Sequence, residues 1–141
     1  MVHSFITCFV GSSDPVYLAN IQSFLLHTPL QNALIKNVFI AETEEELTSQ
    51  LLQNPILSTQ RTLILIDWDF GKHGSYAYIE LCKAIHKEQI EHGNLILIKT
   101  AYDSRKDVMV QTKRDSQVKL FIQRPITKDM IQKAIATILK S

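Results

Sequence analysis

The sequence lacks most of the features that mark a specialised class of protein. Its 15 basic and 14 acidic residues give a formal net charge of +1, so charge offers no argument for binding nucleic acid or a membrane surface. No segment approaches the roughly 20 apolar residues that span a bilayer, and the first residues lack the basic start of a secretory signal. Repeats and low-complexity tracts are also absent. We therefore expect a cytoplasmic protein that binds neither nucleic acid nor membranes.

Cysteine is scarce, which argues against a disulfide framework. Cys8 lies in an apolar run and Cys82 in a helical pattern, so both are predicted to be reduced core residues. The five histidines are scattered, with no spacing typical of a zinc site. Two isolated, reduced cysteines are consistent with a reducing compartment.

The chain does contain a regular alternation of short apolar runs and helical patterns. The five runs are residues 5–10, 38–41, 63–66, 95–98 and 118–122. Strands separated by helices pair in parallel through right-handed crossovers. With 141 residues, the chain suits one domain, residues 1–141. The pattern predicts an α/β fold with a doubly wound, five-stranded parallel sheet.

Four helices have clear start signals and apolar stripes. Asp14-Pro15, Thr43 with Glu46, Gly74-Ser75 and Thr127 mark their beginnings. The predicted inward stripes are Leu18, Ile21 and Leu25; Leu47 and Leu51; Ala77, Leu81, Ala84 and Ile85; and Ile131, Ala134, Ile135 and Ile138. We assign these stripes to the core.

The segment 104–117 differs from the other helical patterns. Only Val108, Met109 and Val110 are apolar there, so a helix in this segment can bury little. Thinly anchored helices belong to the low-stability part of a domain, from which moving and partner-binding elements are drawn. A charged helix exposed to solvent is the alternative.

Asp67 ends the buried run 63–66, and we expect an exposed carboxylate there. In open parallel sheets, ligands bind at the carboxyl edge of the strands. The other strands deliver Gly11-Ser12-Ser13-Asp14, Thr100-Ala101 and Arg124-Pro125 to the same edge, and Trp68-Asp69 follows Asp67. A carboxylate, a hydroxyl and a cation in one crevice suit acceptance of a phosphoryl group, with the carboxylate as nucleophile.

These residues give the chain a resemblance to the receiver domain of two-component response regulators. The resemblance implies a flavodoxin-like sheet with strand order 2-1-3-4-5 and helices on both faces. It implies that Asp67 is the phosphoacceptor, Thr100 the switch hydroxyl and Phe121 the switch aromatic. Arg124 stands where the family has lysine, Pro125 where it has a proline, and Asp69 where a backbone carbonyl binds magnesium.

The chain departs from the family after the first strand. Receivers carry an acidic pair there, and this chain has Ser12 and Ser13. A hydroxyl is a far poorer magnesium ligand than a carboxylate, so a magnesium site at Asp67, Asp69 and Asp14 is expected to be weak or absent. Asp14 turning inward or the Asp69 side chain could compensate, although Asp14 is better placed to cap a helix. Arg124 could hold Asp67 through two hydrogen bonds and mimic one fixed state.

The sequence therefore predicts a stand-alone, atypical receiver domain that acts in signalling by protein–protein contact and is not an enzyme. Its partner would be a sensor histidine kinase or another signalling protein. A homodimer through the segment 104–117, the last strand and the last helix is a further option. We favour a version that works without phosphorylation of Asp67. The alternatives are a flavodoxin-like domain that binds a flavin or another small molecule at Gly11-Ser12-Ser13, and a scaffold domain that does not switch.

Overall fold

A computed structural model of the chain describes residues 4–30, 33–54, 60–67, 70–72, 74–101, 118–123 and 126–140. Five parallel strands form one sheet in the order β2-β1-β3-β4-β5, which confirms the predicted fold class and strand order. The strands are β1 (Ser4–Gly11), β2 (Ala33–Ala41), β3 (Arg61–Asp67), β4 (Leu95–Ala101) and β5 (Val118–Gln123).

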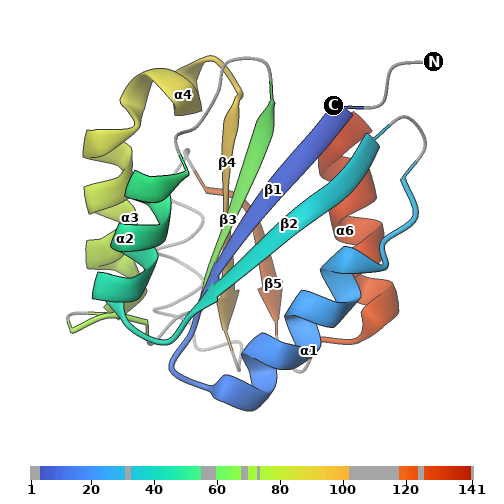
Figure 1. Cartoon of the computed structure of the whole chain (residues 1–141), viewed down its shortest axis with the longest axis horizontal. Helices are drawn as coiled ribbons and strands as arrows, with labels where there is room; N and C mark the ends of the chain where they lie inside the picture. Colours follow the sequence, from blue (N-terminus) through green and yellow to red (C-terminus); the bar gives the residue numbers. More distant parts are fainter. Residues whose placement is uncertain are drawn as a thin grey trace.

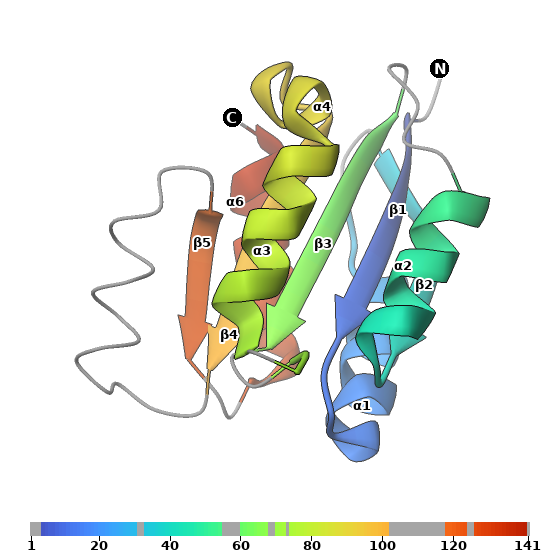
Figure 2. The same cartoon turned by 90° about the vertical axis from the view of Figure 1, so that its left-hand side faces the viewer.

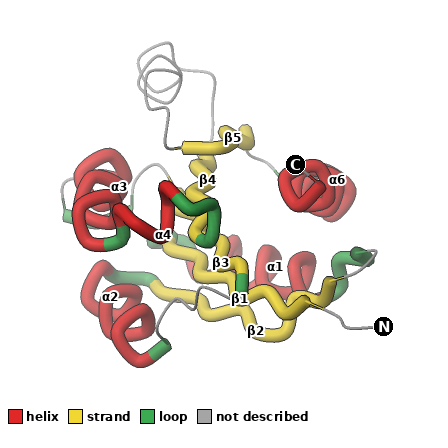
Figure 3. The backbone as a smooth tube through the Cα atoms, turned by 90° about the horizontal axis from the view of Figure 1, so that it is seen from above, coloured by secondary structure: helices red, strands yellow, loops and turns green. Residues whose placement is uncertain are grey.

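Helices cover both faces of the sheet (Figure 1). One face carries α1 (Pro15–Leu26) and α6 (Lys128–Lys140), and the other carries α2 (Glu44–Gln53) and α3 (Gly74–Ile85), followed by the short α4 (Lys87–Glu91). Figure 3 shows these three layers from above, with the strands between the two groups of helices. Each face has its own apolar core, because side chains alternate across the strands. None of the described helices is long and apolar enough to cross a membrane.

The predicted start signals are confirmed at three helices. Asp14, Thr43 and Thr127 each accept hydrogen bonds from backbone N–H groups two or three residues later, at 3.1–3.2 Å. These caps satisfy donors that the first turn of a helix leaves without partners. The buried stripes of α1, α2 and α6 also lie where the sequence predicts them.

The predicted stripe of α3 is wrong. Leu81 and Ile85 are 46% and 58% exposed, and the buried face is formed by Tyr78, Ile79 and Cys82 instead. Tyr78 fixes this rotation, because its ring packs edge-on against the buried Phe70 ring at 5.2 Å and its hydroxyl lies 3.0 Å from Thr48 Oγ1. Helical spacing alone could not distinguish the two neighbouring rows of apolar residues on this helix.

Strand β2 begins at Ala33, well before the predicted run at Val38. It lies at the edge of the described sheet beside β1. Its buried positions are Ile35, Val38 and Ala41, so no continuous apolar run extends along it. A register shift places one extra residue, Lys36, opposite the step between Ile6 and Thr7. This bulge interrupts the alternation that a sequence pattern would detect.

Candidate functional site

The sheet register brings three polar residues together at the carboxyl edge. Gly11 lies opposite Ile66, so Ser12 and Asp67 leave neighbouring strands at the same level. Asp67 in turn lies opposite Thr100 on β4. The predicted convergence of Ser12, Asp67 and Thr100 is therefore present, at the end where the strand arrows point in Figure 2.

Both carboxylate oxygens of Asp67 accept hydrogen bonds from hydroxyl groups. Ser12 Oγ donates to Oδ2 at 2.9 Å, and Thr100 Oγ1 donates to Oδ1 at 2.9 Å. Ser12 Oγ also accepts from the backbone N–H of Asp14 at 3.2 Å. Ser12 thus stands on one side of the carboxylate and Thr100 on the other.

Tyr17 extends this arrangement from α1. Its hydroxyl donates to Thr100 Oγ1 at 2.8 Å, while Thr100 donates onward to Asp67. Hydrogen bonds that run in one direction polarise one another, so each strengthens the next. The Tyr17–Thr100–Asp67 series holds the threonine hydroxyl against the carboxylate.

The site is closed, which corrects the expectation of an exposed Asp67. Asp67 is 1% exposed, and Ser12 and Thr100 are fully buried. Burying a carboxylate is tolerated when its oxygens receive hydrogen bonds, and Ser12 and Thr100 supply them. A phosphoryl donor cannot approach Asp67 in this arrangement without displacing neighbouring groups.

Phe70 covers the face of the site next to α2 and α3. Its backbone N–H donates to the Asp67 carbonyl at 3.1 Å, which turns the chain back after β3, and its side chain is fully buried. A Cβ atom placed on Gly11 would lie 2.9 Å from this ring. Gly11 is needed because the ring packs directly on the backbone that precedes Ser12.

Asp67 and Asp14, the two predicted magnesium ligands that the structure describes, both accept hydrogen bonds from other groups of the chain. Mg²⁺ prefers oxygen ligands in near-octahedral geometry, usually one or two carboxylates together with waters or phosphate oxygens. Among the described residues, no group of three or more His, Cys, Asp or Glu side chains could hold a metal ion. Asp14 Oδ1 accepts from the N–H groups of Val16 and Tyr17 at the start of α1, and the Ser12 hydroxyl donates a hydrogen bond to Asp67 Oδ2.

The same contacts bear on the alternative of a bound flavin or phosphate. The first turn of α1 already binds an anion of its own, the Asp14 carboxylate. The Ser12 N–H donates to the Ala41 carbonyl at 3.1 Å. A phosphate bound at the start of a helix would need backbone N–H groups of this kind, and these three already have acceptors within the chain.

Several predicted site residues lie outside the described part of the chain. These are Asp69, Arg124, Pro125 and the segment 104–117. Phe121 is described through its backbone, which lies in β5 opposite Lys99. Their predicted roles stay predictions.

Two buried polar side chains of the elements that carry the site, Tyr17 and Lys99, were not predicted from the sequence. Tyr17 precedes Ile21 by four positions, so it belongs to the predicted stripe of α1, and this spacing could have placed its hydroxyl inside. Lys99 is buried on β4 between Ile98 and Thr100, directly after the predicted apolar run 95–98. No sequence pattern signalled its burial.

Comparisons with solved structures agree with the fold described above. A response regulator receiver protein from Dyadobacter fermentans matches with a TM-score of 0.76 and 11% identity, covering 96% of this chain and 99% of that chain. A two-component response regulator from Cytophaga hutchinsonii matches with a TM-score of 0.75 and 9% identity over 99% and 100% of the two chains. The chain has the fold of a response regulator receiver domain.

A receiver domain protein from Clostridium thermocellum gives the same result, with a TM-score of 0.72 and 14% identity over 96% of this chain and 94% of that chain. No protein-family model matches the sequence, and no curated protein matches it either. The three structural matches therefore rest on the similarity of the folds, because each of these proteins is only 9–14% identical to this chain.

Proposed function

We propose that this chain is an atypical receiver domain that acts in signal transduction by protein–protein contact, without phosphorylation of Asp67. The observation that carries the proposal is the buried hydrogen-bond series in which Ser12 and Thr100 both donate to Asp67 and Tyr17 donates to Thr100. The receiver fold supports the signalling role, and the hydroxyl donors support its independence from phosphate.

In this proposal, hydrogen bonds from Tyr17 and Thr100 do what a phosphoryl group on Asp67 would do in a switching receiver. In a switching receiver, a phosphoryl group on the aspartate would draw the switch hydroxyl inward, because it adds charge and acceptor oxygens. Here Thr100 already lies 2.9 Å from Asp67. A two-state equilibrium that is biased this way by the sequence favours one conformation before any ligand binds.

The absence of an acidic pair supports the same conclusion. Without a metal, the charges of Asp67 and of an incoming phosphoryl donor repel each other with little compensation. The Ser12 hydroxyl donates a hydrogen bond to Asp67, where a metal ligand would turn a lone pair towards the cation. We infer that the conformation is set by the sequence and by the partner, and not by a catalysed reaction.

The proposed partner is a sensor histidine kinase or another signalling protein. The contact surface would include β5, α6 and the segment 104–117, with a homodimer through the same elements as the alternative. The buried thiols of Cys8 and Cys82 fit a reducing cytoplasm.

Treatment with Mg²⁺ and acetyl phosphate, followed by intact-mass measurement, tests the proposal. We expect the wild-type chain to remain unmodified. The matched control is the double variant Ser12→Asp with Ser13→Asp, which restores two carboxylates and is expected to become phosphorylated at least in part. A stoichiometric phosphate adduct on the wild-type chain that disappears in Asp67→Asn would contradict the proposal.

A further inference from the structure

The outward rotation of α3 leaves an apolar strip on the surface. Leu81 and Ile85 of α3 are 46% and 58% exposed, and Leu52 of the neighbouring α2 is 77% exposed. Single exposed apolar side chains are ordinary, but three on adjacent helices form a patch. Figure 2 shows α2 and α3 together on this side of the sheet.

A groove runs between these helices. It has a volume of about 50 Å³ and is lined by Thr48, Leu51, Leu52, Tyr78, Leu81, Cys82, Ile85 and His86. A volume of this size corresponds to roughly three or four water positions, which is enough to take one branched aliphatic side chain. Helix α2 has 10 residues, so a partner of roughly three helical turns would span the strip.

The two segments that carry the groove are acidic in sum, although the chain as a whole is slightly basic. The segments 42–54 and 70–93, which carry α2, α3 and α4, hold seven glutamates and three lysines, a formal net charge of −4 against +1 for the whole chain. Each lysine lies within 4.0 Å of a glutamate carboxylate, in the pairs Lys72–Glu45, Lys83–Glu80 and Lys87–Glu91. The net charge of −4 therefore corresponds to the four remaining glutamates, Glu42, Glu44, Glu46 and Glu88.

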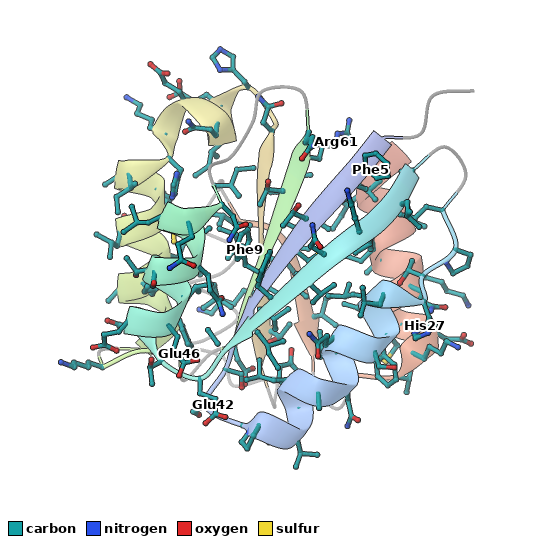
Figure 4. All side chains as sticks on the ribbon, in the orientation of Figure 1. Phe5, Phe9, His27, Glu42, Glu46 and Arg61 are labelled. Carbon is teal, nitrogen blue, oxygen red and sulfur yellow. The ribbon has the colours of Figure 1, made fainter. Side chains whose placement is uncertain are left out.

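Two of these glutamates lie on α2 shortly before the residues that line the groove, and Glu44 Oε1 accepts from the Lys72 N–H at 3.0 Å. Glu44 and Glu45 precede Thr48 by one turn on α2, on the same row as Leu52. Glu44 is close enough to Tyr78 to contribute to the rise in its pKa, which burial mainly causes. Figure 4 shows Glu42 and Glu46 at the start of the same helix.

We propose that this groove, defined by Leu52, Leu81 and Ile85, docks a basic amphipathic helix of a partner protein. An amphipathic helix places apolar side chains at every third and fourth position into such grooves, and lysine or arginine on its flanks would face the glutamates. A second copy of this chain fits less well. In a twofold contact the same patch faces itself, which would bring acidic rims together.

The docking surface lies on the face of the sheet opposite to α1 and Tyr17, so the inference does not rest on the proposed function. Its test uses a synthetic helical peptide of roughly 14 residues, with leucine at helical a and d positions and lysine elsewhere. Titration into the full chain at physiological ionic strength, followed by fluorescence anisotropy, is expected to show saturable binding at a one-to-one ratio. The version with glutamate in place of lysine is expected not to bind.

Variants at exposed positions locate the binding. Leu52→Ser and Ile85→Ser are expected to weaken binding by about tenfold or more, because each removes an apolar anchor. The matched control is Met130→Ser on α6, which is 42% exposed on the other face and is expected to leave affinity unchanged. Thermal midpoints verify that each variant folds.

Three results would overturn the proposal. The first is equal binding by the groove variants and the control, and the second is equal binding of the lysine and glutamate peptides. The third is a wild-type dimer in sedimentation that Leu52→Ser dissociates, because the groove would then be occupied by a second copy.

Discussion

The Tyr17 hydroxyl donates a 2.8 Å hydrogen bond to Thr100 Oγ1, which ties the first turn of α1 to the end of β4. Both side chains are buried, and the same threonine donates to Asp67. A helix that lies beside the site therefore sets the position of the residue that would switch. The proposed fixed state of Thr100 depends on this contact.

Removing the tyrosine hydroxyl is expected to free Thr100. We expect Tyr17→Phe to lower the free energy of unfolding by about 1 kcal/mol, because Thr100 Oγ1 loses a buried donor. The Thr100 side chain should then average over rotamers, as measured by methyl NMR couplings. The matched control is Tyr78→Phe, which removes the hydroxyl next to Thr48 and should leave Thr100 unchanged. An unaltered Thr100 in Tyr17→Phe would show that Tyr17 does not position it.

Ser12 is expected to stabilise the buried carboxylate. Ser12→Ala removes the donor to Asp67 Oδ2 and the acceptor of the Asp14 N–H, so urea denaturation should show a loss of about 1–3 kcal/mol. The control is Ser23→Ala at an exposed position on α1, where a change of about 0.5 kcal/mol or less is expected. Equal losses in both variants would count against the role of Ser12.

The close packing of Phe70 on Gly11 predicts a steric defect. Gly11→Ala is expected to destabilise the fold by about 1–3 kcal/mol, because the added methyl group forces the Phe70 ring to move. Phe70→Leu in the same chain should recover part of this loss. Gly93→Ala is the comparison, since its φ is +76° and nothing lies within 4 Å, so only backbone strain contributes. The absence of any recovery in the double variant would contradict the packing argument.

Stability is expected to fall at high pH. Burial raises the pKa of the Cys8 and Cys82 thiols from 9.0 to about 12, and that of the Tyr78 hydroxyl from 10.0 to about 12. The folded state keeps these protons where the unfolded state releases them, so the free energy of unfolding should decrease as pH rises from 9 towards 12. Tyr78→Phe should make this decrease shallower above pH 10. Urea denaturation at stepped pH gives the slope, and an identical slope in the variant would contradict the assignment.

The sequence was sufficient to predict the sheet and most helices, because its signals there are local. The runs at β3 and β4 are continuous apolar stretches, and Asp14, Thr43 and Thr127 cap helices in the way their chemistry dictates. The edge strand β2 and the inward row of α3 were predicted incompletely or wrongly. Both depend on neighbours that are distant in sequence, β1 for the strand and Phe70 with Thr48 for the helix.

The sequence predicted which described residues meet at the site, but it did not predict that Asp67 is buried there. Strand ends indicated Ser12, Asp67 and Thr100 as neighbours, because parallel strands share one carboxyl edge. Whether Asp67 is open or closed depends on where hydroxyl groups point, and that follows from the three-dimensional packing of Tyr17 and Phe70. Sequence spacing carries no information about those directions.

A titration with beryllofluoride and Mg²⁺ tests the central claim most directly. Beryllofluoride mimics a phosphoryl group on an aspartate, and the Thr100 methyl resonance reports on its arrival beside Asp67. Our account predicts no change in this resonance for the wild-type chain, and a second set of signals for the variant with Ser12→Asp and Ser13→Asp. A second set of signals in the wild-type chain, absent in Asp67→Asn, would show that Asp67 accepts the group and would contradict the account.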